Sequence, residues 1–580
     1  MANREILAAL LTAALAIGCA CWVYAADAEL EAEIQRLGER VDGFEVIALP
    51  GDGEITLTLD QALTAEDLRG VTLDDTPPVL GEPPGDRDTR MVDEWPDGEA
   101  PYEAPDIAPF RFDYFTTEFS YGGWHNWHMH EYAATHGFGV LSAYRYGPDE
   151  WTHMPEGTRW LKWGGLVNWH KWMDERGIEE RHYHELADLD LLELMLQEKS
   201  LAHNPQFDQL MIDMEHGLIG PEKLREQDWY PADGTDAEKA ALEQRYYDAY
   251  AQTYVAPVEA ARQNGWRDIS VYGWQPFSRT FWGLGEATAD PATHFGWNAY
   301  GRRIYDAVDI LNPSVYCFYA SRQNVAYTLA NIDLNMRLIA SADEHKPMRP
   351  YYWNLLHGGG GGERWWARQP LPDEDMRAMT AMCFFTGCDG LVLWSWSGTG
   401  NHHRPRIEAE QHVMVGEAFA LEPEAGGEAT GFARYDVLYV DEVAEDGPVQ
   451  FRLVNPGAGN LGVEDGAPVF AMARDELAPL LRPDSSPIAA MVEGLALVKP
   501  LEYLLRHGEV VIDVPAQQQF ANTLPIVRRV AFDGYHAIAT YDPMALETGQ
   551  ARTVSIEIEG AAVIAPADEQ VRIFVLQAQQ

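Results

Sequence analysis

Short apolar runs rich in valine, isoleucine, tyrosine and tryptophan alternate with helical patterns between residues 110 and 400. Eight of these runs have the length and composition of buried strands, namely 111–118, 138–144, 159–165, 207–213, 269–274, 313–319, 348–354 and 389–395. Helical periodicity lies between most of them, at 125–136, 184–202, 235–264, 297–309, 322–343 and 373–386. Repeated strand–helix alternation of this kind predicts an α/β fold, a (β/α)8 TIM barrel.

The barrel is expected to occupy residues 110–507, because a helical pattern at 487–507 supplies the last helix. Pro500 should kink or split that helix. The stretch 398–484 reads as an insertion with strands at 436–440 and 449–454. From residue 508 to 580 the pattern alternates like an antiparallel, sandwich-like β-module, with strands at 510–514, 526–532, 536–541, 553–558 and 571–576.

The first 25 residues read as a signal peptide, with Arg4 before a short apolar run and a small-residue cleavage site ending at Ala25. Cys19 follows a partial lipoprotein box that lacks the usual leucine, so a lipid anchor is a minority alternative. The pattern predicts no membrane span, and a protein secreted from a bacterium or held in its periplasm or cell envelope. Residues 26–109 read as an N-terminal extension that ends in a proline- and acid-rich linker.

The 580-residue chain carries 91 acidic and 42 basic residues, a formal net charge of −49, with only seven lysines. The acidic residues are spread along the chain, which is typical of a solvated coat suited to high salt. Such a balance argues against nucleic acid as a partner, because phosphate needs a basic footprint. Three cysteines follow the cleavage site, so at least one thiol is free and no disulfide scaffold is expected.

Asp213 and Glu215 stand at the end of the fourth predicted strand. Residues i and i+2 of a strand share a face, so the two carboxylates should project side by side. Because two close carboxylates cannot both ionise freely, one pKa should rise. A carboxylic acid that stays protonated near neutral pH can donate its proton to a leaving oxygen. The alternative is an acidic strand end that only caps the next loop.

Aromatic and polar residues accompany this pair at the carboxyl ends of the other strands, where barrel active sites lie. Aromatic rings with polar tips suit sugars, which offer apolar CH faces and a rim of hydroxyls. Although any single tryptophan is more often core than contact, the repetition at several strand ends predicts a polysaccharide-binding cleft. The candidate contacts are Glu118, Tyr272, Trp274, Tyr319, Trp353, Asn354, His357, Trp394 and Trp396.

The Asp213-x-Glu215 strand end, Tyr319 after the sixth strand and a tryptophan closing the eighth resemble hyaluronidase and chitinase-type glycoside hydrolases. The segments LNPSVYCFY and GCDGLVLWSW resemble the sixth and eighth strands of hyaluronidases in particular. The resemblance covers about residues 110–400. It implies that Glu215 is the general acid/base, that Asp213 stabilises the substrate's 2-acetamido group as the nucleophile, and that Tyr319 contacts that group.

The sequence departs from these families at several positions. The acidic run of chitinases is replaced by Leu210, Met211 and Ile212, and His216 stands where hyaluronidases usually carry an acid. The chain is acidic, whereas a hyaluronidase cleft is basic. Arg279 and Arg322 are nevertheless candidates for a local anion site, which would suit a sulfated or uronic polysaccharide. An endo-fucanase-type retaining glycosidase, with a protein carboxylate as nucleophile, also fits the pattern.

Several histidines lie on loops after the last two strands, including His402 and His403. Hydrogen bonding to substrate or loop packing is favoured over metal binding there, because convergence of three or four ligands is not evident. The glycines at 358–362 lack a following GK[ST], so they read as a lid hinge and not as a phosphate loop. No metal or other cofactor is expected.

Two function classes follow from these patterns. The leading hypothesis is a glycoside hydrolase, expected to be endo-acting, that uses Glu215 and Asp213 on a polysaccharide. The alternative is a non-catalytic carbohydrate-binding or cell-envelope protein on a barrel scaffold, since fold alone does not settle function.

Overall fold

The computed structural model describes 28–82, 106–121, 127–142, 151–166, 169–215, 217–277, 284–287, 289–319, 321–357, 371–395, 418–420, 437–443, 448–454, 468–477 and 487–578. Several predictions fall outside these residues and keep the status of predictions. They concern the signal peptide with Cys19, the glycine run, most of the insertion, and His216, Arg279, Trp396, His402 and His403.

Eight parallel strands form one sheet in the order β8-β7-β6-β5-β4-β3-β10-β9. They are β3 (Thr116–Tyr121), β4 (Val140–Ser142), β5 (Arg159–Leu166), β6 (Gln209–Asp213), β7 (Asp268–Tyr272), β8 (Ile310–Asn312), β9 (Tyr351–Tyr352) and β10 (Gly390–Ser395). Bridges Leu311–Met348 and Ser314–Tyr351 join the two outer strands, β8 and β9. The predicted (β/α)8 barrel is confirmed.

The first and the sixth predicted strands are displaced from the observed ones. The first begins at Thr116 and not at 111, because the backbone amides of Tyr114 and Phe115 donate to the Glu502 carboxylate, at 2.5 and 3.1 Å, instead of joining the ladder. The sixth is β8, which ends before Pro313. Proline cannot donate to a ladder, so the segment predicted as strand 313–319 continues as extended chain.

Helices cover the barrel, as the alternation predicted. The described α-helices from the barrel region are α2 (Trp127–Thr135), α3 (Trp169–Asp174), α4 (Leu191–Leu196), α5 (Pro221–Arg225), α6 (Asp236–Gln263), α7 (Phe295–Asn298), α8 (Gly301–Ala307), α9 (Asn324–Ile339), α10 (Asp373–Phe384), α12 (Pro487–Val498) and α13 (Glu502–His507). Short 3-10 turns are η5 (Tyr183–Asp188), η6 (Lys199–Leu201), η7 (Leu284–Glu286) and η11 (Lys499–Leu501).

Local sequence explains the principal helices. Thr235 and Glu238 form a capping box at the start of the long helix α6. The predicted helix 184–202 is instead three pieces, η5, α4 and η6, because Asp190 caps a new start by accepting from the Glu193 amide. The predicted break at Pro500 is confirmed, since η11 separates α12 from α13.

The inner and outer faces of the barrel strands follow strict alternation. On β6, Leu210 and Ile212 belong to the large core shared with the surrounding helices, whereas Met211 belongs to a separate inner cluster. That inner cluster also holds Val140, Leu161, Tyr351 and Val392, each from a different barrel strand. Gln209 and Asp213 share the parity of Met211, so they also face the barrel interior.

A charged group is enclosed below this apolar layer. Arg349 Nη1 donates to Glu118 Oε1 at 2.6 Å, and Gln209 Nε2 donates to Glu118 Oε2 at 2.9 Å. The side chains of Arg349 and Glu118 are only 9% and 1% exposed. The carboxylate is therefore paired and hydrogen-bonded, as a buried charge must be.

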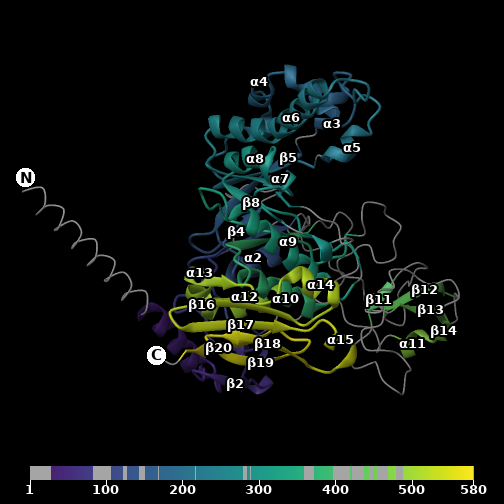
Figure 1. The fold of residues 1–580 in the computed structure, drawn as a ribbon. Helices are drawn as coiled ribbons and strands as arrows, with labels where there is room; N and C mark the ends of the chain where they lie inside the picture. Colours follow the sequence, from purple (N-terminus) through teal and green to yellow (C-terminus); the bar gives the residue numbers. More distant parts are fainter. Residues whose placement is uncertain are drawn as a thin grey trace, which may run out of the picture.

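The C-terminal β-module contains two sheets that enclose their own core (Figure 1). It consists of β15 (Glu509–Val511), α14 (Ala516–Asn522), β16 (Ile526–Phe532), β17 (Tyr535–Tyr541), α15 (Ala545–Thr548), β18 (Arg552–Ile558), β19 (Ala561–Ala567) and β20 (Arg572–Gln577). Val527 and Ile538 face this core, whereas Val530 and Ala537 belong to the large core of the barrel. The five-stranded sheet thus packs on the barrel.

The N-terminal extension is built into this module. It contains helix 28–40, β1 (Ile47–Ala48), β2 (Gly53–Thr56), η1 (Leu59–Gln61) and η2 (Glu66–Leu68). Strand β1 pairs in parallel with β20, and β2 pairs in parallel with β19. The two ends of the chain therefore complete each other's sheets.

The insertion contributes a four-stranded antiparallel sheet, part of which the sequence predicted. Its described elements are β11 (Ala418–Ala420), β12 (Val437–Val443), β13 (Val449–Val454), β14 (Val469–Met472) and α11 (Arg474–Leu477). Elsewhere, Cys317, Cys383 and Cys388 are buried free thiols, which confirms the expectation of a free cysteine. Among the described helices, none has the length and apolar character needed to cross a membrane.

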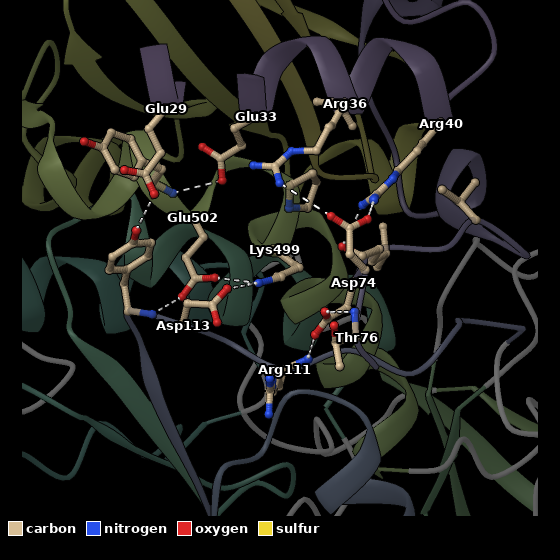
Figure 2. A pocket seen from close by; sticks show the side chains of 17 residues that line it. Glu29, Glu33, Arg36, Arg40, Asp74, Thr76, Arg111, Asp113, Lys499 and Glu502 are labelled. Carbon is tan, nitrogen blue, oxygen red and sulfur yellow. Dashed lines mark hydrogen bonds and ion pairs between the residues drawn. The ribbon is translucent and has the colours of Figure 1, made fainter. Parts of the chain in front are cut away.

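A cavity of about 490 Å³ lies between the N-terminal helix, the segment before β3 and the α12–α13 turn (Figure 2). Lys499 Nζ donates to Asp113 Oδ2 at 3.0 Å and to Glu502 Oε2 at 2.9 Å. Glu33 accepts from the Tyr503 amide, and burial raises the pKa of Glu33 to about 8. These charges join three segments at the amino-terminal end of the barrel, away from the strand ends that carry Asp213.

Candidate active site

Asp213 is the last residue of β6 and points into the barrel at its carboxyl end. Asp213 is only 9% exposed, and its buried Oδ1 has no hydrogen-bond partner among the described residues. Burial, followed by repulsion from Glu215, raises the pKa of Asp213 to about 7. The prediction that one carboxylate of the pair has a raised pKa is confirmed.

The member of the pair that holds the proton differs from the expectation. Asp213 is buried, whereas Glu215 lies beyond the strand end and is exposed. Since desolvation is the larger cause of the shift, the buried Asp213 is the group whose neutral form is favoured. Strand alternation alone did not reveal this difference in burial.

Three tyrosines of the inner face lie under the acidic pair. The charges of Glu215 and Asp213 both contribute, after burial, to raising the pKa of Tyr272 to about 12. Glu215 also acts on buried Tyr316, and Asp213 on buried Tyr351, whose pKa values are raised mainly by burial. All three hydroxyls therefore stay protonated and able to donate hydrogen bonds.

The predicted aromatic residues at the last strand ends do come together. The ring centroids of Trp353 and Trp394 are 5.1 Å apart and nearly perpendicular. Tyr316 lies 5.8 Å from each of them, and Tyr272 contacts Tyr351 at 5.0 Å. This edge-to-face cluster forms an aromatic floor at the carboxyl end of the barrel.

Asn354 and His357 extend this floor on the segment after β9. The His357 ring lies 5.4 Å from the Trp353 ring and 4.7 Å from the Phe318 ring, and burial lowers its pKa. The His357 Nδ1 and the Asn354 Oδ1 are both buried, and neither has a hydrogen-bond partner within the part of the chain that the structure describes. Buried polar atoms of this kind are ready to bind a polar ligand group.

Three predicted contacts are placed elsewhere. Glu118 lies inside β3, not at its end, and is held by Arg349. Trp274 is 6% exposed and belongs to the large core between the barrel strands and the helices, because Gly273 takes a φ of +71° and breaks the strand alternation. Tyr319 packs against the same large core, and its carbonyl accepts a hydrogen bond from Asn324 Nδ2.

The suggested anion site at Arg322 is corrected by the structure. Arg322 is buried, and its Nε donates to Glu547 Oε1 of the C-terminal module at 3.2 Å. This pair joins the barrel to the module, so the guanidinium does not line the strand ends.

Sequence reasoning missed Tyr316, Tyr351 and Trp163 as members of the inner face. Tyr351 and Tyr316 belong to the inner cluster, and Trp163 packs against it. The alternation of side chains along a strand could have found them. Trp163 is two residues after inward-facing Leu161, and Tyr316 is four residues after inward-facing Asn312, so each shares a face with that residue. Selecting the last residue of each predicted strand gave Tyr319 instead of Tyr316 as the candidate.

The loop that follows Glu215 is anchored by neighbouring elements. Tyr183 of η5 donates from its hydroxyl to the Gly217 carbonyl at 3.2 Å, and Tyr247 of α6 donates to the Ile219 carbonyl at 2.9 Å. These bonds satisfy two carbonyls of the loop and hold the chain that follows the exposed acid in place.

The arrangement thus offers a carboxyl group poised to hold a proton, a second exposed carboxylate two residues away, and aromatic surface beside them. Such a pair is suited to general acid–base chemistry on a ligand that stacks on the aromatic floor. Within the described ranges, no group of three or more histidine, cysteine, aspartate or glutamate residues is placed to bind a metal ion.

No known protein-family model and no curated protein sequence matches this chain. Among solved structures, bee venom hyaluronidase is similar at 14% identity and a TM-score of 0.33, covering 50% of this chain and 93% of its own. A noncanonic maltogenic alpha-amylase from Thermotoga neapolitana is similar at 10% identity and a TM-score of 0.32, covering 80% of this chain and 96% of its own.

A β-porphyranase of glycoside hydrolase family 86 from Bacteroides plebeius is also similar, at 11% identity and a TM-score of 0.28, covering 80% of this chain and 76% of its own. The similar solved structures named here are thus glycoside hydrolases, each at low identity.

Proposed function

We propose that this protein is a glycoside hydrolase that cleaves a polysaccharide internally, with Glu215 as general acid/base and Asp213 as its partner. The observation that supports this most directly is the raised pKa of Asp213, next to exposed Glu215 and above an aromatic floor. A single proton shared by the two carboxylates supplies both an acid and a negative charge.

In the free protein the shared proton rests on Asp213. When the glycosidic oxygen lies beside Glu215, the proton passes to Glu215 and then to that oxygen as the bond to the anomeric carbon breaks. Asp213, now ionised, stabilises the positive charge on the sugar or on its 2-acetamido group. A water then adds to the anomeric carbon and returns its proton to Glu215.

The remaining described acid of the inner face, Glu118, supports this division of roles. Glu118 is 1% exposed and lies in the layer below Met211. Its carboxylate already accepts hydrogen bonds from Arg349 and Gln209. It is thus not placed to act as a separate protein nucleophile, as the endo-fucanase-type alternative requires. We therefore favour the sugar's own acetamido group as the nucleophile, with Asp213 as the group that stabilises the intermediate.

The predicted signal peptide supports action outside the cytoplasm, where the enzyme would encounter polysaccharides. This part of the proposal, which includes secretion or retention in the periplasm or cell envelope, rests on the sequence alone.

The test is the Glu215→Gln variant, assayed beside wild type on a panel of marine and animal polysaccharides with sizing of the products. One general acid contributes roughly 10²- to 10⁴-fold, so turnover should fall by at least this factor while the melting temperature stays unchanged. Glu222→Gln, an exposed glutamate of α5, is the matched control and should keep full activity.

Near wild-type turnover in Glu215→Gln would contradict the assignment. Binding without cleavage by the wild-type protein would favour the non-catalytic carbohydrate-binding alternative. Internal cleavage should give a ladder of oligosaccharides, whereas release of monosaccharide alone would overturn the endo mode.

A further inference from the structure

Arg181 lies against the loop that follows Glu215. A β-carbon added to Gly217 would stand 3.5 Å from Arg181 Nη2 and 3.7 Å from Nε. Gly217 is two residues after Glu215 and is held by the Tyr183 hydroxyl. A cationic side chain from an earlier loop therefore lies against the chain two residues beyond Glu215.

The backbone at Arg181 adopts a left-handed conformation, with a φ of +67°. This conformation is sterically unfavourable for a residue with a β-carbon, and glycine, asparagine or aspartate would adopt it with less strain. Strained residues of this kind cluster at binding sites, where the surrounding structure holds them in place.

The guanidinium is open to a ligand. The Arg181 side chain is 54% exposed, and its ion-pair partner, Glu180 Oε1, stands 3.6 Å from Nε on a side chain that is 63% exposed. At this distance and exposure the contact is a weak surface pair. The planar fork of N–H donors can still form two parallel hydrogen bonds to one anionic group.

Neutralising the acidic pair does not account for this arginine. The causes that act on the pKa of Asp213 from the described residues are burial and Glu215, and both raise it. The charge of Arg181 acts instead on Tyr183 and Tyr246, to whose pKa values it makes a minor contribution.

We propose that Arg181 binds an anionic substituent, a carboxylate or a sulfate ester, on the sugar next to the bond that Glu215 addresses. This inference rests on the proposed function, because it places the polysaccharide across the Asp213–Glu215 pair. A chain with a formal net charge of −49 repels a polyanion at long range, so a fixed arginine is needed for close contact.

The test measures binding separately from turnover. Proteins carrying Glu215→Gln, alone or with Arg181→Gln, are titrated with size-defined oligosaccharides in 0.5 M salt, which screens the acidic coat. The probes are a sulfated fucan and its desulfated form, and hyaluronan and its carboxyl-reduced form. Sulfate and carboxylate are thereby tested apart. Arg176→Gln is the matched control, because Arg176 is exposed in the same region and stacks on Trp172 at 3.5 Å.

We expect Arg181→Gln to weaken binding of one anionic probe by about 10- to 100-fold and to leave its neutral form unchanged. Arg181→Lys should restore part of the loss, since it keeps the charge without the fork. Equal affinities in Arg181→Gln and its parent, equal losses on anionic and neutral probes, or no binding of either anionic probe would overturn the inference.

The two proposals fail differently. Hydrolysis of neutral polysaccharides alone, through Glu215, would overturn the role of Arg181 and leave the proposed function standing. Binding of an anionic probe through Arg181, with no cleavage by the wild-type protein, would support the anion site and contradict the hydrolase.

Discussion

The hydroxyl of Tyr541, in strand β17 of the C-terminal module, donates a hydrogen bond to Asp375 Oδ1 in barrel helix α10 at 2.6 Å, and both residues are fully buried. This bond crosses the boundary between two parts of the chain that the sequence presents as separate modules. Together with the Arg322–Glu547 pair and the shared core, it makes the module part of the barrel's fold.

Tyr541→Phe should therefore destabilise the whole protein by about 1–3 kcal/mol, because it removes the donor to a buried carboxylate. Chemical denaturation followed by fluorescence measures the change. Tyr535→Phe in the same strand is the control, and we expect a change within about 0.5 kcal/mol there. Two separate unfolding transitions, with only the module affected, would contradict this integration.

Deletion of residues 509–580 tests the same relationship more severely. It removes the sheet whose Val530 and Ala537 pack into the large core of the barrel, and it leaves β1 and β2 without their partner strands. We expect insoluble protein, or soluble protein without a cooperative melting transition. A soluble truncation with full activity would show that the module is an independent appendage.

The pair formed by Arg349 and Glu118 gives a prediction about the barrel interior. Arg349→Met leaves the Glu118 carboxylate buried with only Gln209, so we expect a loss of roughly 3–5 kcal/mol in unfolding free energy. Adding Glu118→Gln should recover much of the loss, since the uncompensated charge is then gone. A double variant as unstable as Arg349→Met would show that packing, and not charge, dominates at this position.

The raised pKa of Asp213 predicts a pH-dependent stability. The folded protein holds a proton on Asp213 up to about pH 7, whereas the unfolded chain releases it near pH 4, so this group lowers stability as pH rises between these values. Asp213→Asn should thus stabilise the protein at pH 8, by about 2–4 kcal/mol, and give no gain at pH 4.

Urea denaturation of wild type and Asp213→Asn at both pH values checks this sign. The variant should also lose turnover, because the shared proton and the stabilising charge both disappear. Equal stability gains at pH 4 and pH 8 would mean that the effect comes from packing and not from titration.

The barrel was predictable because its signals are local. In the barrel, apolar runs alternate with helical periods. In the C-terminal module, the Asp533-Gly534 pair, with φ values of +48° and +77°, forms the turn of the β16–β17 hairpin, as Asp-Gly usually does. The acidic pair was also local, since Asp213 and Glu215 are two residues apart. What the pattern could not show was their unequal burial, which depends on where β6 ends.

Other features depend on contacts between distant segments. The pairing of β1 with β20 joins the two ends of the chain, and no local pattern specifies it. Strand β19 was missed because its sequence, AAVIAPA, contains alanine and proline, which are rare in strands, and its pairing with β18 and β2 comes from other parts of the chain. Arg181 was missed because its neighbour, Gly217, lies in another loop.

The last prediction concerns ionic strength. With 91 acidic against 42 basic residues, about fifty charges are uncompensated, and their repulsion is strongest in the compact folded state. Salt screens it within a Debye length of about 10 Å at 0.1 M, so the melting temperature should rise clearly from low salt to molar sodium chloride. A nonionic osmolyte at matched osmolality serves as the control, because it favours burial without screening charge. A melting temperature that rises with salt but not with the osmolyte supports adaptation of the acidic coat to a saline habitat. A melting temperature that does not change with salt would leave the excess charge as a feature of composition without a role in stability.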